Sequence, residues 1–217
     1  MGSPGGEFYN ALPGDSITDD IGNRSSNLDW NHVLGHGYVY LIASRLSCDH
    51  PSKRFHFFNR GISGNKVTDL AARWQEDVLD IKPRPLSILV GVNDVNSLFT
   101  RENPVAADSF QEVYAGLLTR TREQLPDVRI VLCEPFLLPV GRVKDQWEAW
   151  SSEMKVQQTI VRELASQFNA IFVPLQGEFN KACEKAPPDY WIWDGIHPMP
   201  GGHELIARKW IRVVLGH

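Results

Sequence analysis

Residues 86–94 read Leu-Ser-Ile-Leu-Val-Gly-Val-Asn-Asp, an apolar run followed by a turn of small and polar residues. The run from Leu86 to Val90 is almost continuously apolar, which is typical of a β-strand that is covered on both faces. Pro83 and Pro85 come just before the run and end the helical pattern that precedes it. We therefore expect this strand to lie inside a parallel sheet, because parallel sheets are buried on both faces.

Segments with strand and helix patterns alternate on both sides of this run. Between residues 67 and 79, for example, apolar residues recur with the spacing of one face of an amphipathic helix. Strands separated by helices form βαβ units with right-handed crossovers, so we expect an α/β fold with a mainly parallel sheet and helices on both faces. The patterns predict strands at 8–12, 54–58, 86–90, 128–133 and 170–173, and helices at 37–48, 67–79, 105–125, 146–168 and 202–214.

The composition of the 217-residue chain is that of an ordinary globular protein. Apolar residues make up 42% and charged residues 22%, which excludes the disordered and fibrous classes. The net charge is −4, with 22 Lys and Arg against 26 Asp and Glu, so we expect no nucleic-acid partner. The three cysteines lie far apart and form no C-x-x-C motif, so we expect no disulfide scaffold and no structural zinc site.

Apolar stretches and the N-terminal residues bear on membrane association and cellular location. No stretch approaches the roughly 18 apolar residues of a membrane helix, so no membrane partner is expected. Residues 1–8 look like a cloning scar, and we treat residues 9–217 as one domain. No export signal is visible, which makes a cytoplasmic location the default expectation, although a natural signal could have been removed with the original N-terminus.

In a parallel α/β sheet the ligand site lies beyond the carboxyl ends of the strands, and the unusual residues of this sequence fall in such loops. Gly14-Asp15-Ser16 directly follows the first predicted strand. A glycine there allows a sharp turn that exposes the serine hydroxyl and directs N–H groups to a common point. The same three residues are also common in turns and helix caps, so alone they indicate little.

Three further loops offer complementary groups. Residues 59–65 carry two glycines three positions apart, which allow free backbone N–H groups or simply a turn after a strand. Asn93 offers an uncharged side-chain donor, although it could equally form a turn or cap a helix. Asp194 and His197 are three residues apart, so the carboxylate could hold the imidazole in one tautomer. A lone histidine is more often structural, but this one has an acid within reach.

Together these segments resemble the four sequence blocks of the SGNH hydrolase superfamily, also called GDSL-like esterases, and they appear in the same order. The resemblance runs from Gly14 to the C-terminal helix. It implies a three-layer α/β/α sandwich with a central parallel five-stranded sheet, of the flavodoxin-like type. The matching blocks are Gly14-Asp15-Ser16, Ser63-Gly64-Asn65, Gly91-x-Asn93-Asp94 and Asp194-x-x-His197-Pro198.

The resemblance also implies an activity, that of a carboxylic ester hydrolase that works without cofactor or metal. Ser16 would be the nucleophile, His197 the general base, and Asp194 the residue that orients the base. The oxyanion hole would consist of the backbone N–H groups of Ser16 and Gly64 and the side chain of Asn93. An acyl-serine intermediate would form and then be hydrolysed by water.

Other segments resemble the bacterial acetylxylan esterase branch of this superfamily. This resemblance implies removal of acetyl groups from a carbohydrate, with an acetylated sugar or another short-chain ester as the small-molecule substrate. Candidate substrate-binding residues are Asp15, Arg24, Trp191 and Trp193. The two tryptophans flank the Asp-His loop and could stack on a sugar, but core packing or a subunit contact explains them equally well, and Arg24 could simply be a surface charge. The segments are Asp15–Asp19, Gly35–Val39, Asn59–Asn65, Ala72–Trp74 and Trp193–Pro198.

Two alternatives stay open. One is a lipid-directed acylhydrolase or thioesterase of the same superfamily, which would prefer longer acyl chains. The other is a non-catalytic carbohydrate-binding protein on the same fold, which would be expected to lack a triad member. The sequence also leaves open whether the protein forms a homo-oligomer.

Two local features depart from the simplest expectation. The first predicted strand contains the polar Asn10 and is followed by Pro13, which lacks the N–H that a central strand needs. If this strand is frayed, Ser16 is less well held and activity suffers. His203 follows two glycines at the start of the last predicted helix, and we expect a solvated cap there.

Overall fold

The computed structural model describes residues 8–19, 33–100 and 104–216, and its centre is a five-stranded sheet. The strand order is β2-β1-β3-β4-β5, and every neighbouring pair is parallel. This order is that of the flavodoxin-like fold, in which the strand order reverses between β1 and β3. The strands are β1 (Phe8–Gly14), β2 (Phe55–Gly61), β3 (Leu86–Ile88), β4 (Ile130–Cys133) and β5 (Ile171–Val173).

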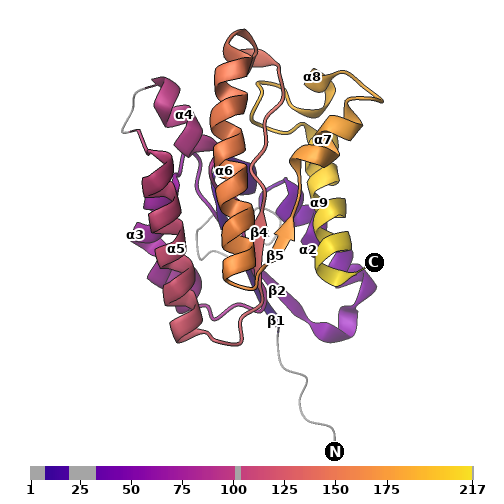
Figure 1. Ribbon diagram of the computed structural model, residues 1–217. Coiled ribbons are helices and arrows are strands. Elements are labelled where there is room, and N and C mark those ends of the chain that lie inside the picture. Colours follow the sequence, from indigo (N-terminus) through magenta and orange to yellow (C-terminus); the bar gives the residue numbers. More distant parts are fainter. Residues whose placement is uncertain (1–7, 20–32, 101–103, 217) are drawn as a thin grey trace, which may run out of the picture.

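Helices cover both faces of the sheet, so the three-layer α/β/α prediction is confirmed (Figure 1). Apolar side chains of α2 and α9 pack on one face, and those of α3, α5 and the C-terminal half of α6 pack on the other. The described helices are α1 (Ser16–Asp19), α2 (Tyr38–Asp49), α3 (Val67–Trp74), α4 (Val92–Thr100), α5 (Ala107–Gln124), α6 (Trp147–Gln167), α7 (Gln176–Ala182), α8 (Pro188–Trp191) and α9 (Pro200–Leu215).

Strand β4 shows how the apolar runs of the sequence build the two cores. Val131 and Cys133 point into the cluster formed with α2 and α9, whereas Ile130 and Leu132 point into the cluster formed with α3 and α5. All four side chains are buried. Because successive residues of a strand face opposite sides, a strand that is covered on both faces needs apolar residues at every position.

The first strand is intact, which answers the question that Asn10 and Pro13 raised in the sequence. Each residue of β1, from Phe8 onward, pairs with a residue of β2. Asn10 is buried, and its amide donates to the carbonyl oxygen of His56 at 3.2 Å. Pro13 has no N–H to donate, but its carbonyl oxygen accepts a hydrogen bond from Leu89 N at 3.4 Å. The strand therefore tolerates both residues because the polar groups that they bring into the sheet are bonded.

Several elements differ in extent from the sequence prediction. Strand β2 continues to Gly61, three residues beyond the expected end. Helix α4 occupies residues for which the sequence suggested only a loop, so Asn93 lies in the first turn of a helix. Helix α3 is followed directly by a wider π-helical turn over Gln75–Leu79, and the two together span the helix predicted at 67–79.

Candidate active site

The Gly14-Asp15-Ser16 turn connects β1 to α1 at the carboxyl edge of the sheet, beside the reversal of strand order. Ser16 is the first residue of α1, and its side chain is half-buried. Gly14 sits so close to its neighbours that a Cβ atom there would lie 2.3 Å from Oγ1 of Thr18 and 2.6 Å from the carbonyl oxygen of Leu89. There is no room for a side chain at this position, which explains the glycine of the Gly-Asp-Ser block.

Ser16, His197 and Asp194 form one chain of hydrogen bonds across the site. Ser16 Oγ lies 2.9 Å from Nε2 of His197, and Nδ1 of the same ring lies 2.9 Å from Oδ2 of Asp194. The other carboxylate oxygen, Oδ1, accepts the backbone N–H groups of Ile196 at 3.0 Å and His197 at 2.8 Å. The Asp194 carboxylate thus orients both the ring and the loop that carries it.

The environment of Asp194 keeps its carboxylate ionised. Burial alone would raise its pKa, but the hydrogen bonds from the His197 ring and from the backbone of His197 and Ile196 outweigh burial and hold the pKa of Asp194 well below its usual range. A permanently charged carboxylate next to the imidazole stabilises the ring when it becomes protonated.

The candidate oxyanion groups come from three loops at the same edge. Gly64 is exposed in the loop after β2, with a left-handed φ of 81°. Asn93 is half-buried, and its Nδ2 donates to the carbonyl oxygen of Asn65 at 3.2 Å, which ties the start of α4 to the Gly64 loop. Among the residues that the structure describes, the backbone N–H groups of Ser16 and Gly64 donate to no other protein group.

Arg73 on α3 holds these loops together, a role that the sequence reasoning missed. Its Nε donates to Oδ1 of Asn65 at 3.0 Å, and its Nη2 donates to the carbonyl oxygen of Gly14 at 3.1 Å. Its Nη1 reaches Arg60 O at 2.7 Å and also pairs with the buried Asp77. The sequence offered one signal, because Arg73 lies in the Ala72–Trp74 segment that resembles the acetylxylan esterase branch.

Two carboxyl groups near the Ser16 turn, those of Asp15 and Asp94, are buried. Asp15 is only 1% exposed, so we correct its assignment as a substrate contact: its Oδ1 accepts Ile17 N at 3.0 Å and braces the turn instead. Within the described part of the chain, its Oδ2 is buried without a hydrogen-bond partner. Asp94 accepts Val67 N at 3.1 Å. Burial raises the pKa of Asp15 and that of Asp94 to about 7.

The three remaining predicted site residues have different surroundings. Trp193 is 58% exposed, and its ring stacks on His197 with 5.9 Å between centroids. Trp191 is half-buried, packs edge-on against Tyr190 and donates its Nε1–H to Ala186 O at 3.2 Å, so it is a packing residue of the loop. Arg24 lies outside the described residues.

His203 also needs a correction, because it is not a solvated cap. Its side chain is 6% exposed, and its Nδ1 accepts the backbone N–H of Tyr38 at 3.2 Å. The ring therefore joins α9 to the N-terminus of α2, where the first backbone N–H groups of a helix lack partners within the helix.

Within residues 8–19, 33–100 and 104–216, no three His, Cys, Asp or Glu side chains gather as metal ligands. None of the helices in the described part of the chain is long and apolar enough to cross a bilayer.

Comparison with known proteins agrees with the geometry. The model of the GDSL-like lipase/acylhydrolase family matches residues 13–205. An acetylxylan esterase from Geobacillus stearothermophilus is 33% identical over 211 residues, which cover 93% of this chain and 91% of that enzyme.

Solved structures give the same result. A putative GDSL-like lipase from Parabacteroides merdae has 38% identity and a TM-score of 0.90, over 95% of this chain and 94% of that one. The Geobacillus enzyme, Axe2, has 32% identity and a TM-score of 0.85 over the same shares. Its structures include catalytic mutants in which a serine, an aspartate and a histidine are replaced by alanine. The chain therefore belongs to the GDSL-like lipase/acylhydrolase family and is a carboxylic ester hydrolase with the SGNH hydrolase fold.

Proposed function

We propose that this protein is a serine esterase that removes acetyl groups from carbohydrates through an acyl-Ser16 intermediate. The observation that carries the proposal is the hydrogen-bonded chain from Ser16 through His197 to Asp194, with both side-chain contacts at 2.9 Å. A hydroxyl bonded to a base that a carboxylate orients is the arrangement that acyl transfer requires. The catalytic mutants of Axe2 replace the same three residue types, which supports these roles.

In the first half of the reaction, Ser16 Oγ attacks the ester carbonyl while Nε2 of His197 takes the hydroxyl proton. Negative charge develops on the carbonyl oxygen, and the N–H groups of Ser16 and Gly64 and the amide of Asn93 donate to it. When the tetrahedral intermediate collapses, the bond to the sugar oxygen breaks. His197 gives its proton to that oxygen, and the acetyl group stays on Ser16.

In the second half, a water molecule attacks the acyl carbonyl while His197 takes one of its protons. The bond between the carbonyl carbon and Ser16 Oγ then breaks, and His197 returns the proton to the serine. Acetate leaves and the enzyme is restored. Asp194 stabilises the imidazolium in both halves because its own carboxyl group stays ionised.

A carbohydrate substrate is supported by the surface beside the base. Among the described tryptophans Trp193 is the exposed one, and it lies against the His197 ring. A sugar ring presents C–H groups that pack well on an aromatic face, so Trp193 offers a place where the leaving sugar can rest next to the general acid. The 33% identity to an acetylxylan esterase points to the same substrate class.

A lipid-directed acylhydrolase or thioesterase is the second candidate. It is favoured by the description of the matching family as lipase/acylhydrolase and by the 38% identity to a putative GDSL-like lipase. Rates with p-nitrophenyl acetate and p-nitrophenyl octanoate separate the two candidates. We expect the acetyl ester and acetylated xylo-oligosaccharides to be preferred, and a strong preference for octanoyl would overturn the deacetylase proposal.

The central test is Ser16→Ala with p-nitrophenyl acetate as substrate. We expect kcat/KM to fall on the order of 10⁴-fold or more, because the nucleophile of such a triad cannot be replaced by its neighbours. Ser166→Ala is the matched control, since Ser166 is an exposed serine near the end of α6. Full activity of Ser16→Ala would remove the proposed mechanism.

A further inference from the structure

The loop that carries the triad acid is held by a second loop, which we call the β4–α6 loop (residues 134–146). Leu138 N donates to the carbonyl oxygen of Gly195 at 3.1 Å, and Arg142 N donates to that of Asp194 at 3.2 Å. Gly141 fits against the backbone of Asp194 so closely that a Cβ atom there would lie 2.4 Å from Asp194 Cα. The two loops therefore pack with little freedom to shift against each other.

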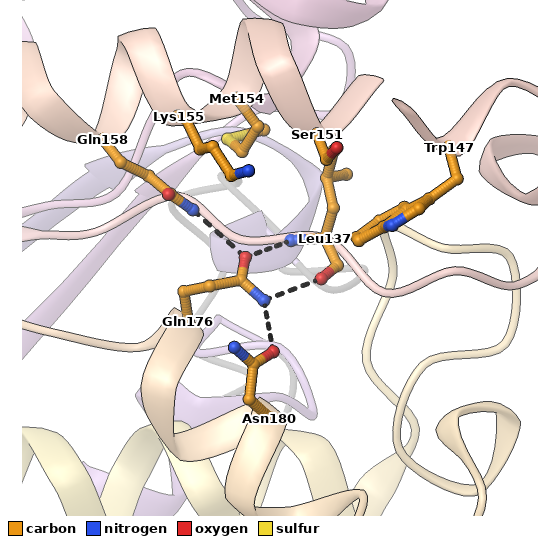
Figure 2. Close-up of a pocket in the computed structure, with 8 residues that line it drawn as sticks. All are labelled: Leu137, Trp147, Ser151, Met154, Lys155, Gln158, Gln176 and Asn180. Atoms are coloured by element: carbon orange, nitrogen blue, oxygen red, sulfur yellow. Dashed lines mark hydrogen bonds between the residues drawn. The ribbon is translucent and has the colours of Figure 1, made fainter. Parts of the chain in front are cut away.

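The β4–α6 loop is also held by Gln176 of α7 (Figure 2). The carboxamide of Gln176 accepts Leu137 N at 3.0 Å and donates to Leu137 O at 2.9 Å, in the manner of a neighbouring strand. Gln158 on α6 donates to the same carboxamide oxygen at 3.1 Å. These residues line a cavity of about 100 Å³ between α6 and α7. The loop thus presents Arg142 from a well-held backbone.

The side chain of Arg142 reaches the triad itself. Its Nη2 lies 2.5 Å from Oδ2 of Asp194, the same oxygen that bonds Nδ1 of His197 at 2.9 Å. Asp194 is 5% exposed in its side chain, whereas Arg142 is 49% exposed. One carboxylate oxygen is therefore shared between the imidazole of the base and a guanidinium group that comes from outside the four family blocks.

We propose that Arg142 is a positioning residue that acts through Asp194 to set the pH range in which His197 works as a base. The inference rests on the proposed roles of Ser16, Asp194 and His197. The guanidinium takes part of the negative charge of Oδ2, which weakens the attraction between Asp194 and a protonated imidazole. It also repels that imidazolium directly. Arg142 consequently favours the neutral ring, which is the form that accepts the serine proton.

The other groups around the His197 ring do not favour its neutral form: two are carboxylates that favour the protonated ring, and the third is uncharged. Asp194 on the same loop attracts the protonated ring, and so does Asp15 from the turn after β1 when it is ionised. Trp193 covers one ring face but carries no charge. Among the groups that the structure places in contact with Asp194, Arg142 is the cation that opposes these two carboxylates.

The first measurement is the pH dependence of kcat/KM for p-nitrophenyl acetate in Arg142→Gln, Arg142→Lys and wild type. We expect the acid limb of Arg142→Gln to move to higher pH by roughly half a unit to one unit, because a half-exposed charge is partly screened. The rate on the alkaline plateau should stay within about tenfold of wild type, since the triad remains complete. Arg142→Lys, which restores the charge, should bring the limb back toward the wild-type position.

The matched control is Arg162→Gln. Arg162 is also an exposed arginine paired with a buried carboxylate, Glu134, at 3.2 Å, but the contacts described for the Glu134 carboxylate are with Arg162 and Gln176 N, not with Asp194 or His197. Its acid limb should stay at the wild-type position. An unshifted limb in Arg142→Gln, or an equal shift in Arg162→Gln, would overturn the proposal.

A second measurement keeps the inference separate from the proposed function. NMR titration of the His197 ring, assigned with His197→Gln, follows the same protonation without turnover. We expect its midpoint to rise in Arg142→Gln by the same amount as the acid limb. If Ser16→Ala kept full activity, the proposed function would fail, but the titration would still decide the role of Arg142. If the titration midpoint of the His197 ring did not move in Arg142→Gln, the proposed role of Arg142 would be rejected. This holds even if the mutant were less active because part of it failed to fold.

Discussion

Replacing Asp15 by asparagine should change how the stability of the protein depends on pH. The Asp15 side chain is 1% exposed, and its Oδ2 has no hydrogen-bond partner among the residues that the structure describes. Burial raises its pKa from an ordinary 3.8 to about 7. The folded protein therefore prefers the protonated group, whereas the unfolded chain releases the proton near pH 4. The stability that this preference contributes is complete below pH 4 and is lost as the pH rises through 7.

The size of the effect follows from the two pKa values. One unit of pKa corresponds to about 1.4 kcal/mol. The pKa rises from 3.8 to about 7, and about two units of this rise, from pH 5 to pH 7, fall within the interval from pH 5 to pH 8. Asp15 should therefore lower the wild-type free energy of unfolding by about 2.5 kcal/mol over that interval. Asparagine cannot ionise, so this contribution disappears in Asp15→Asn. Asp94, whose pKa burial also raises to about 7, leaves part of the pH dependence in place.

The assay is urea unfolding of wild type and Asp15→Asn at pH 5 and pH 8. The quantity of interest is the difference in unfolding free energy between the two proteins at each pH. Any fixed cost of the new amide cancels when these differences are compared, because that cost does not vary with pH. We expect the mutant to gain about 2.5 kcal/mol relative to wild type on going from pH 5 to pH 8.

Asp127→Asn is the control, because Asp127 is an exposed aspartate in the turn before β4. It should leave the difference between the two pH values unchanged. The reasoning would be refuted if Asp15→Asn and wild type lost stability in parallel from pH 5 to pH 8. That result would mean that the buried carboxyl group is ionised in the folded protein at both pH values and finds compensation elsewhere.

Two further changes test the oxyanion groups and the loop contact. Asn93→Ala should lower kcat/KM by about 10²–10³-fold while the thermal midpoint moves little, because in the proposed mechanism the lost amide donates to the developing oxyanion, and among the described residues it bonds Asn65 O alone. Kinetics with p-nitrophenyl acetate and a melting curve check this. Gly141→Ala should cost roughly 1–3 kcal/mol in urea unfolding and reduce activity, because φ is 54° and the new Cβ would meet Asp194 Cα at 2.4 Å. Gly116→Ala in α5, where a Cβ would meet nothing within 4 Å, should instead be neutral or stabilising.

Much of the fold follows from the pattern of residues along the chain. Runs such as Ile130–Cys133 are apolar at every position, and this is possible only for a strand with a core on each face. Strands of that kind separated by amphipathic helices leave a parallel sheet as the consistent solution. The loops at the carboxyl ends of the strands then meet at one edge, which is why Ser16 and His197, 181 residues apart, lie within hydrogen-bonding distance.

The errors of the sequence reasoning concern burial and partners. Asn10 and Pro13 suggested a weak strand because polarity and a missing N–H count against a strand in general, but here the amide and the carbonyl find acceptors and donors on neighbouring strands. His203 suggested a solvated cap, yet it is buried where it accepts Tyr38 N. Local sequence does not show which polar groups will find a partner from another element.

The order of residues alone establishes the α/β class, the blocks around Ser16 and Asp194, and the edge of the sheet where they gather. Periodicity and turn chemistry are local properties, so they can be read along the chain. Only the tertiary structure decides that Asp15 is buried beside Ser16 and that Arg142 shares an oxygen of Asp194 with His197. Electrostatic energy depends on distance and on exclusion of water, and both arise only when separate segments pack together.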